Sequence, residues 1–206
     1  MQSDVDLPCP TCKNEGSLKL LSMSSEIPYF GEHTQITLSC EKCGMRQTDF
    51  IPSEERGALS FKLSIEKDEH LQARVVRGSS GTVRIPELDL EVSPGTQSTG
   101  YVSNVEGVVN RFIDIIRMMM RQMRTEIEEG NDEASQNLEK LFQLEMALMA
   151  LVKGELQGDL SLEILDPKGH SIIGHDDAVK KELSADEVAQ LDPGPAPIIM
   201  SSKDVE

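Results

Sequence analysis

Four cysteines carry the spacing in this sequence that points most directly to chemistry. Cys9 and Cys12 form one Cys-x2-Cys pair, and Cys40 and Cys43 form a second pair after a gap of 27 residues. Each pair can fold as a knuckle, a tight turn that directs two thiolates at one ion. Four thiolates suit tetrahedral Zn²⁺ and leave no coordination position open for water or substrate. The sequence therefore predicts one structural Zn²⁺ bound by these four cysteines.

Two other uses of paired cysteines fit less well. A disulfide framework requires an oxidising compartment, and residues 1–7 carry two aspartates and no apolar block typical of a secretory signal. A dithiol redox pair is expected beside a strand–helix unit, whereas Lys-Asn-Glu-Gly follows Cys12. The gap between the pairs is longer than the usual spacing of about 15–20 residues. Zinc remains the preferred interpretation.

The histidines suggest a second, weaker hypothesis. His175 and Asp177 form a His-x-Asp pair with His170 nearby, and two histidines with one carboxylate can bind non-haem iron. Both histidines lie in polar turn sequence, so ordinary surface histidines are the preferred interpretation. The sequence also lacks a Ser-His-Asp pattern, a phosphate-binding glycine loop and a GxSxG elbow. We therefore expect a protein that is not an enzyme.

The elements that position the cysteines change in character along the chain. Residues 60–92 alternate apolar and polar side chains over short runs, which predicts antiparallel strands joined by tight turns such as Gly78-Ser79-Ser80-Gly81. Strand-like alternation resumes at residues 160–164, with a turn at residues 166–169. The interval between these strand regions has a period of about 3.6, which predicts a helical hairpin inserted into a sheet domain.

Each predicted helix of the hairpin has an apolar stripe. The first stripe consists of Val105, Val109, Phe112, Ile116, Met119, Met123 and Ile127. The second consists of Leu138, Leu141, Phe142, Leu144, Leu148 and Leu151. Ser103 and Glu106 have the form of a capping box for the first helix, and residues 130–132 form a short joint that requires antiparallel helices.

The first helix of the hairpin also carries four arginines, Arg111, Arg117, Arg121 and Arg124. A solvent-exposed helix face is the preferred interpretation, and a basic docking strip for an acidic partner is the alternative. Met118, Met119, Met120 and Met123 pose a similar choice between core packing and an adaptable binding surface.

The domain limits follow from these patterns. We expect a four-cysteine zinc ribbon over residues 1–52 and a sheet domain over residues 53–192, with the hairpin at about residues 103–154. Residues 193–206 have the Pro-rich, acidic composition of a flexible tail. The predicted fold class is mainly β with an α insertion.

The composition of the chain limits the classes of partner that it can bind. The chain has 206 residues and a net charge of −16, and the first fifty residues alone carry four Lys/Arg against seven Asp/Glu. Such charge repels nucleic-acid phosphates and anionic lipid surfaces. No apolar run reaches the length of about 20 residues that a membrane span needs. We expect a cytoplasmic protein that does not bind membranes, with nucleic acid disfavoured as a partner.

Several blocks of sequence resemble the ZPR-type zinc-finger family. They are Cys9-Pro-x-Cys12, Ile27-Pro28-Tyr29-Phe30-Gly31-Glu32, Ser39-Cys40-Glu41-x-Cys43-Gly44-Met45-Arg46, Val76-Arg77-Gly78-Ser79, Ile85-Pro86-Glu87-Leu88, Asn104-Val105-Glu106-Gly107 and Asp166-Pro167-x-Gly169-x-Ser171. In the last block, His170 stands where the family has Asn. The resemblance covers about residues 7–173.

The resemblance implies a zinc ribbon joined to a double-stranded β-helix domain that carries a helical hairpin. Eukaryotic members look like tandem copies of this module, whereas this chain has one copy, as single-module archaeal relatives do. It further implies a non-enzymatic protein that binds translation elongation factor 1-alpha in its GDP-bound form and has a chaperone role in its folding. The runner-up is a nucleic-acid-binding zinc-ribbon factor of the transcription or translation machinery, because a ribbon fold does not determine function.

The segment between the two cysteine pairs is the expected partner surface. Ile27, Tyr29 and Phe30 place apolar and aromatic side chains in a sequence that is only 3% aromatic. Aromatic residues are enriched at interaction hot spots. The alternative, which the residues favour equally, is that Tyr29 and Phe30 pack on the sheet domain and orient the ribbon.

Overall fold

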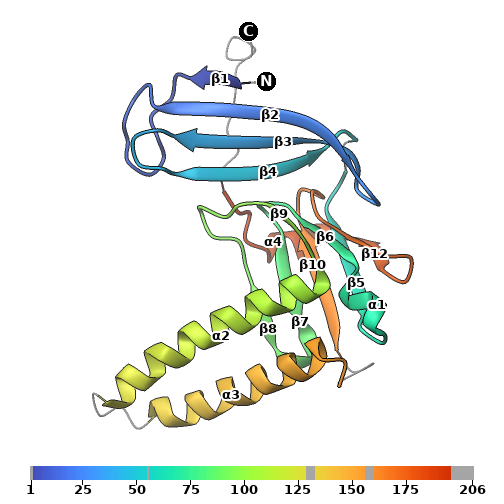
Figure 1. Cartoon of the computed structure of the whole chain (residues 1–206). Coiled ribbons are helices and arrows are strands. Elements are labelled where there is room, and N and C mark those ends of the chain that lie inside the picture. The colour runs from blue at the N-terminus through green and yellow to red at the C-terminus, as the bar shows by residue number, and fades with distance from the viewer. Residues whose placement is uncertain (1, 55, 129–132, 156–159, 196–206) are drawn as a thin grey trace.

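The computed structural model describes residues 2–54, 56–128, 133–155 and 160–195. Figure 1 shows the N-terminal four-stranded sheet at one end and a long helical hairpin at the other, with the remaining strands between them. This arrangement places the zinc knuckles and the hairpin at opposite ends of the molecule. No helix in the described part of the chain is long and apolar enough to cross a membrane.

The ribbon is an antiparallel sheet with strand order β1-β2-β3-β4. Its strands are β1 (Gln2–Val5), β2 (Leu18–Ile27), β3 (Gly31–Cys40) and β4 (Arg46–Pro52). Leu18 is paired with Cys40 and Leu20 with Leu38, so alternate side chains of the two long strands face the same side. They form a small core whose buried members are Val5, Cys9, Leu18, Leu20, Leu38 and Cys40.

The sheet domain consists of two sheets that share one core. The five-stranded sheet has the order β12 (Val179–Glu182), β5 (Leu59–Ser64), β10 (Ser161–Asp166), β7 (Thr82–Ile85), β8 (Leu90–Val92). The three-stranded sheet has the order β11 (Ile172–Gly174), β6 (Arg74–Arg77), β9 (Tyr101–Asn104). The short helices are α1 (Asp68–Leu71), η1 (Pro86–Leu88) and α4 (Ala185–Ala189).

The hairpin is an insertion into this sheet domain, as the periodicity predicts. Strand β10 follows the hairpin in sequence, yet it pairs with β5 and β7, which both precede it. The fold is therefore mainly β with a helical insertion, and that prediction is confirmed. The hairpin consists of α2 (Val105–Glu128) and α3 (Glu133–Val152). The predicted joint at residues 130–132 lies outside the described residues.

The predicted apolar stripes of the hairpin match the buried residues near the sheet domain and are wrong at two positions. On α2, Met120 is buried, whereas the predicted Met119 is 40% exposed. At 3.6 residues per turn, Met120 is rotated about 40° around the helix axis from Ile116, and Met119 about 60° in the other direction. Met120 is therefore closer to the buried face and takes the core position. On α3, Leu148 and Leu151 are buried, but Phe142 is 52% exposed. The four arginines of α2 are all exposed, as predicted.

The start of α2 also differs from the predicted capping box. The side-chain oxygen of Asn104 accepts a hydrogen bond from the backbone N–H of Gly107 at 2.8 Å. Asn104 therefore occupies the N-cap position in place of Ser103, and satisfies one of the free N–H groups of the first turn.

The ribbon and the sheet domain meet at a separate apolar cluster. Phe30 and Phe50 from the ribbon are buried together with Val76 from β6. Beside this cluster the carboxylate of Asp49 accepts hydrogen bonds from the backbone N–H and the hydroxyl of Ser79, at 2.8 and 2.6 Å. The backbone N–H of Gly100 donates to the carbonyl of Thr48 at 2.6 Å. Both polar and apolar contacts thus hold the ribbon on the sheet domain.

The first residues of the expected tail also lie against the sheet domain. Pro195 is buried, and the Lys168 ammonium lies 3.5 Å from its carbonyl oxygen. A Cβ on Gly194 would meet the Ser79 carbonyl oxygen at 3.0 Å, so this segment passes close to the 78–81 turn. Residues 196–206 lie outside the described part of the chain.

Candidate metal centre

Two equivalent turns bring the cysteine pairs together. In the first, the backbone N–H of Lys13 donates to the carbonyl of Cys9 at 2.8 Å, and in the second the N–H of Gly44 donates to the carbonyl of Cys40 at 3.0 Å. Lys13 and Gly44 both have a positive φ, 60° and 72°. Each turn therefore closes in the left-handed region, which glycine adopts freely and lysine adopts at a conformational cost.

The sulfur atoms have the spacing of a tetrahedral zinc site. The Sγ atoms of Cys9 and Cys43 are 3.8 Å apart, as are those of Cys12 and Cys40, and all four lie within 4.8 Å of one another. A tetrahedron with Zn–S bonds of about 2.3 Å has S···S edges of about 3.8 Å. A disulfide would need about 2.05 Å, and all four cysteines are free. The four thiols are close enough to bind one zinc ion.

Local hydrogen bonds favour the thiolate form that a metal requires at Cys9 and Cys40. At Cys43 the Met45 backbone N–H lowers the pKa, but burial and the neighbouring thiols outweigh it and raise the pKa to about 12. The backbone N–H of Cys12 points at the Cys9 sulfur and lowers the pKa of that thiol. The Ser17 hydroxyl lies 3.3 Å from the Cys40 sulfur and lowers the pKa of Cys40 to about 6. Metal binding displaces the thiol protons, so these contacts reduce the cost of loading the site.

The two sides of the metal centre differ in exposure. Cys9 and Cys40 are buried in the ribbon core, whereas Cys12 and Cys43 are exposed. Within the described residues, no histidine or carboxylate joins the four thiols. A set of four sulfurs with no fifth group nearby is typical of a structural zinc site and not of a catalytic one.

Comparison with known proteins agrees with this geometry. A family model described as the ZPR1 zinc-finger domain matches residues 4–55, and one described as the ZPR1 jelly-roll domain matches residues 69–190. The chain belongs to the ZPR1 family. The two sheets of the sheet domain are accordingly its jelly-roll domain, and the ribbon is its zinc-finger domain.

The similarity to known relatives extends over most of the chain. An uncharacterized ZPR1-like protein of Methanocaldococcus jannaschii is 37% identical over 94% of this chain and 92% of its own length. A similar protein of Pyrococcus horikoshii is 34% identical over 93% of this chain and 82% of its own length. The relative in Schizosaccharomyces pombe, named zinc finger chaperone zpr1, is 27% identical over 68% of this chain and 30% of its own length. This chain thus corresponds to one part of the longer eukaryotic protein.

A second group of possible ligands lies in the jelly-roll domain, and its members differ from those expected. His70, on α1, takes the place of His170 beside His175 and Asp177, with Glu69 also near. The imidazole rings of His70 and His175 have centroids 4.8 Å apart. His170 lies elsewhere, with its Nδ1 at 3.9 Å from Asp49. No sequence motif singled out His70, because its approach depends on the docking of α1.

The hydrogen bonds of this group leave its histidines without a lone pair for a metal. The Glu66 backbone N–H donates to Nδ1 of His70 at 3.1 Å, so Nε2 carries the ring proton and donates to Asp177 at 3.1 Å. In the same way, the backbone N–H of Asp177 donates to Nδ1 of His175. The hydrogen bond from His70 lowers the pKa of Asp177. The group is a hydrogen-bonded brace between α1 and the segment after β11.

The bend expected to bind a partner is divided between the interior and the surface. Phe30 is fully buried at the junction of the two domains, where the Arg56 guanidinium lies 5.1 Å from its ring centroid. Ile27 is half-buried, and Tyr29 is 60% exposed. Tyr29 also has a φ of 66°, which turns the chain sharply between β2 and β3. The orienting role weighed for both aromatics thus applies fully to Phe30. Tyr29 also packs against Gly174 of β11, where a Cβ would lie 2.9 Å from the Tyr29 Cβ, and its exposed part is the aromatic surface that a partner can reach.

Proposed function

We propose that this chain is a non-enzymatic, zinc-dependent protein that binds translation elongation factor 1-alpha in the cytoplasm and assists its folding. Membership of the ZPR1 family carries this proposal, together with the relative named as a zinc finger chaperone. Cys9, Cys12, Cys40 and Cys43 are its zinc ligands in this proposal, and the ion has a structural role. A chaperone needs a shaped surface and no catalytic group, which agrees with a closed metal site.

In this proposal the client binds at the bend through Tyr29, with Ile27 beside it and Phe30 as its buried support. A hollow of about 390 Å³ adjoins the exposed ring and includes Tyr29, Glu32, Glu54 and Arg56. An apolar side chain of the client can pack on the Tyr29 ring at this surface, and the charged residues at the rim can orient the client. The net charge of −16 adds long-range attraction toward a factor that handles RNA and is expected to have basic surfaces.

The test is a titration of purified client with zinc-loaded wild type, Tyr29→Ala and Met23→Ala. Met23 is the matched control, because it is 59% exposed on the same ribbon but lies on β2 away from the bend. We expect Tyr29→Ala to weaken binding by at least about tenfold, the effect of losing a hot-spot side chain. Met23→Ala should change affinity by less than about twofold. Circular dichroism and zinc content should be normal for both variants.

Three outcomes contradict parts of the proposal. Equal affinities for the two variants remove the bend from the interface. The absence of measurable client binding by the wild type overturns the assigned function. Tight nucleic-acid binding that weakens steeply with salt supports the alternative of a nucleic-acid-binding ribbon factor.

A further inference from the structure

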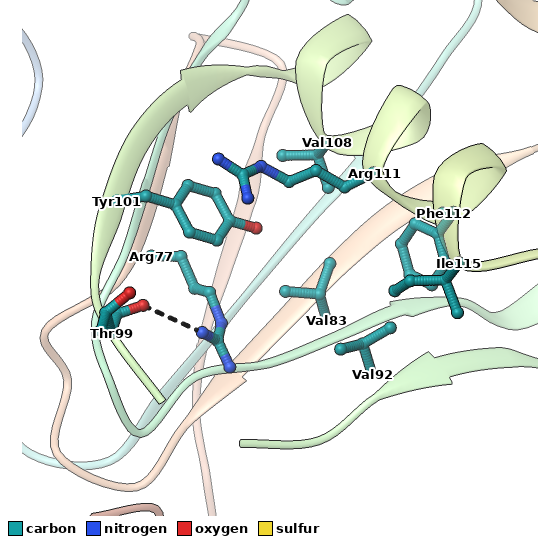
Figure 2. A pocket seen from close by; sticks show the side chains of 9 residues that line it. All are labelled: Arg77, Val83, Val92, Thr99, Tyr101, Val108, Arg111, Phe112 and Ile115. Atoms are coloured by element: carbon teal, nitrogen blue, oxygen red, sulfur yellow. Dashed lines mark hydrogen bonds between the residues drawn. The ribbon is translucent and has the colours of Figure 1, made fainter. Parts of the chain in front are cut away.

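A cavity of about 220 Å³ lies where helix α2 crosses the jelly-roll sheets, far in sequence from the cysteines. Figure 2 shows apolar side chains, Phe112 among them, at one side of the cavity and two arginines with a tyrosine at the other. The apolar members of the lining are Val83, Val92, Val108, Phe112 and Ile115, and the polar members are Arg77, Thr99, Tyr101 and Arg111.

Arg77 is a buried cation whose donors are not all used. It is 6% exposed, and its guanidinium donates to the carbonyl of Gly81 at 2.8 Å, the hydroxyl of Ser98 at 2.9 Å and the carbonyl of Thr99 at 3.3 Å. A guanidinium has five N–H donors, so the two on Nη2 have no acceptor among the described residues. No described carboxylate lies within ion-pair distance. Burial lowers the pKa of Arg77, and the more distant Asp166 and Asp49 offset part of this effect. Nη2 is not among the described buried polar atoms that lack a partner, so its two donors are open to a ligand or to water.

Arg111 places a second cation without an acidic partner at the same cavity. Its guanidinium lies 4.1 Å from the centroid of the Tyr101 ring, and that of Arg77 lies 5.7 Å from the same ring. In Figure 2 the two arginines approach the ring from opposite sides. Further along α2, Arg117 forms an ion pair with Glu145, whereas Arg111 has no carboxylate partner among the described residues. In a chain of net charge −16, two arginines at one cavity that form no ion pair within the described residues favour an anion.

The cavity also provides a neutral donor for that anion. Burial raises the pKa of Tyr101, so its hydroxyl remains protonated at neutral pH. This hydroxyl has no hydrogen-bond partner among the described side chains and backbone groups. A guanidinium with a phenol beside it suits a carboxylate, which accepts a bidentate arginine contact and a further hydrogen bond. The second guanidinium, across the ring, adds positive charge.

We propose that this cavity binds a small carboxylic acid with a branched aliphatic or phenyl tail. Its carboxylate lies at Arg111 and the Tyr101 hydroxyl, with Arg77 adding positive charge from the other side of the ring. Its tail packs among the valines, Phe112 and Ile115. The size supports this class, because an apolar cavity of about 150 Å³ accommodates one benzene molecule. The additional volume here fits a carboxylate and a short linker. Binding joins α2 to the sheets and does not depend on the proposed client.

The probe is 4-methylpentanoate, with 4-methylpentanamide as the uncharged control, titrated into the zinc-loaded full chain. Chemical-shift changes should report binding of the acid with a millimolar or lower Kd, at residues that line the cavity. The amide should bind at least about tenfold more weakly, because it lacks the charge that strengthens hydrogen bonds to guanidinium. Saturating acid should also raise the Tm, since it binds only the folded chain.

Arg111→Gln is the decisive variant because Arg111 is exposed, so its replacement leaves the buried core intact. We expect it to weaken binding of the acid by at least about tenfold. Arg121→Gln is the matched control, an exposed arginine of α2 that does not line the cavity, and its Kd should change by less than about twofold. Ile115→Phe should also weaken binding, because its ring occupies tail space.

Several results overturn the proposal. These are the absence of binding by the wild type up to about tens of millimolar acid, equal affinity for the acid and the amide, and equal affinity of Arg111→Gln and Arg121→Gln. Shifts confined to residues away from the cavity have the same consequence.

Discussion

The zinc ribbon and the jelly-roll domain are both antiparallel β structures, but different forces hold them together. Among the described residues, the jelly-roll core has 22 buried members contributed by both sheets and both hairpin helices. The ribbon core has six in the same described part of the chain, and two of those are the metal-binding cysteines Cys9 and Cys40. A sheet with so little apolar burial cannot offset its loss of chain entropy. Zinc therefore replaces in the ribbon what hydrophobic packing supplies in the jelly-roll domain.

Removal of zinc should produce the largest difference in stability between the two domains. Replacing Cys40 and Cys43 together by Ser leaves two ligands, and we expect the ribbon to lose on the order of 10 kcal/mol of metal-linked folding free energy. Hydrogen exchange followed by mass spectrometry should show fast exchange over β1–β4 and protection retained over β5, β7 and β10. Elemental analysis provides the control. Unchanged zinc content in the double variant contradicts the ligand assignment, and loss of protection in both domains contradicts their separate stability.

Truncation of a buried side chain in the hairpin should destabilise the jelly-roll domain and leave the zinc site unchanged. Leu148 is fully buried against the jelly-roll core, so Leu148→Ala should reduce the free energy of unfolding by about 2–5 kcal/mol. Leu141 is half-buried, and its replacement by Ala should cost less. Phe142→Ala, at a 52% exposed site on the same helix, is the control, with an expected effect below about 0.5 kcal/mol. Denaturant titration measures all three, and zinc content should stay constant.

The junction between the two domains should respond to pH. Burial of the Asp49 carboxyl raises its pKa, but the nearby His170 and the two hydrogen bonds from Ser79 outweigh burial, so the net pKa is lowered. The Nδ1 atom of His170 lies 3.9 Å from the Asp49 carboxylate, farther than the two Ser79 donors. Because the pKa is lower in the folded chain, the Asp49 carboxylate stabilises the fold at pH values above its unfolded pKa of about 3.9. This contribution is lost as the pH falls through the folded pKa.

Asp49→Asn tests this junction. We expect it to cost about 1–3 kcal/mol at neutral pH, because it removes a charged acceptor from two hydrogen bonds. The difference between variant and wild type should shrink below about pH 4. Denaturant titrations at neutral and acidic pH, with His170→Asn as a second variant, measure this change. A difference that stays constant with pH would show that the Asp49 charge does not stabilise the junction.

The two knuckles provide the smallest and most local test. Lys13 and Gly44 occupy equivalent positions with positive φ, and a Cβ on Gly44 would meet no atom within 4 Å. The cost of a side chain there is therefore conformational. Lys13→Gly should stabilise the ribbon by about 1 kcal/mol, and Gly44→Ala should destabilise it by about the same amount. Zinc-competition titrations report both changes, and effects of the same sign contradict the equivalence of the two turns.

Much of the site and the fold could be predicted because the responsible interactions are local in sequence. The spacing within each Cys-x2-Cys pair determines a turn, and two such turns predict a shared ion. Helical periodicity predicts the hairpin and its exposed arginines, because a helix positions side chains by residue number alone. The insertion of the hairpin between paired strands follows from the same change of period.

Tertiary structure decided everything that depends on which surfaces meet. Tyr29 and Phe30 are neighbours of the same chemical type, and only the docking of the ribbon on β6 buries one and exposes the other. The approach of His70 to Asp177 and of Arg77 to Tyr101 likewise joins segments that are distant in sequence. Residue type and spacing determine local backbone geometry and ligand chemistry. Long-range packing, in which many weak contacts compete, determines burial, and with it the surface left for a partner or a ligand.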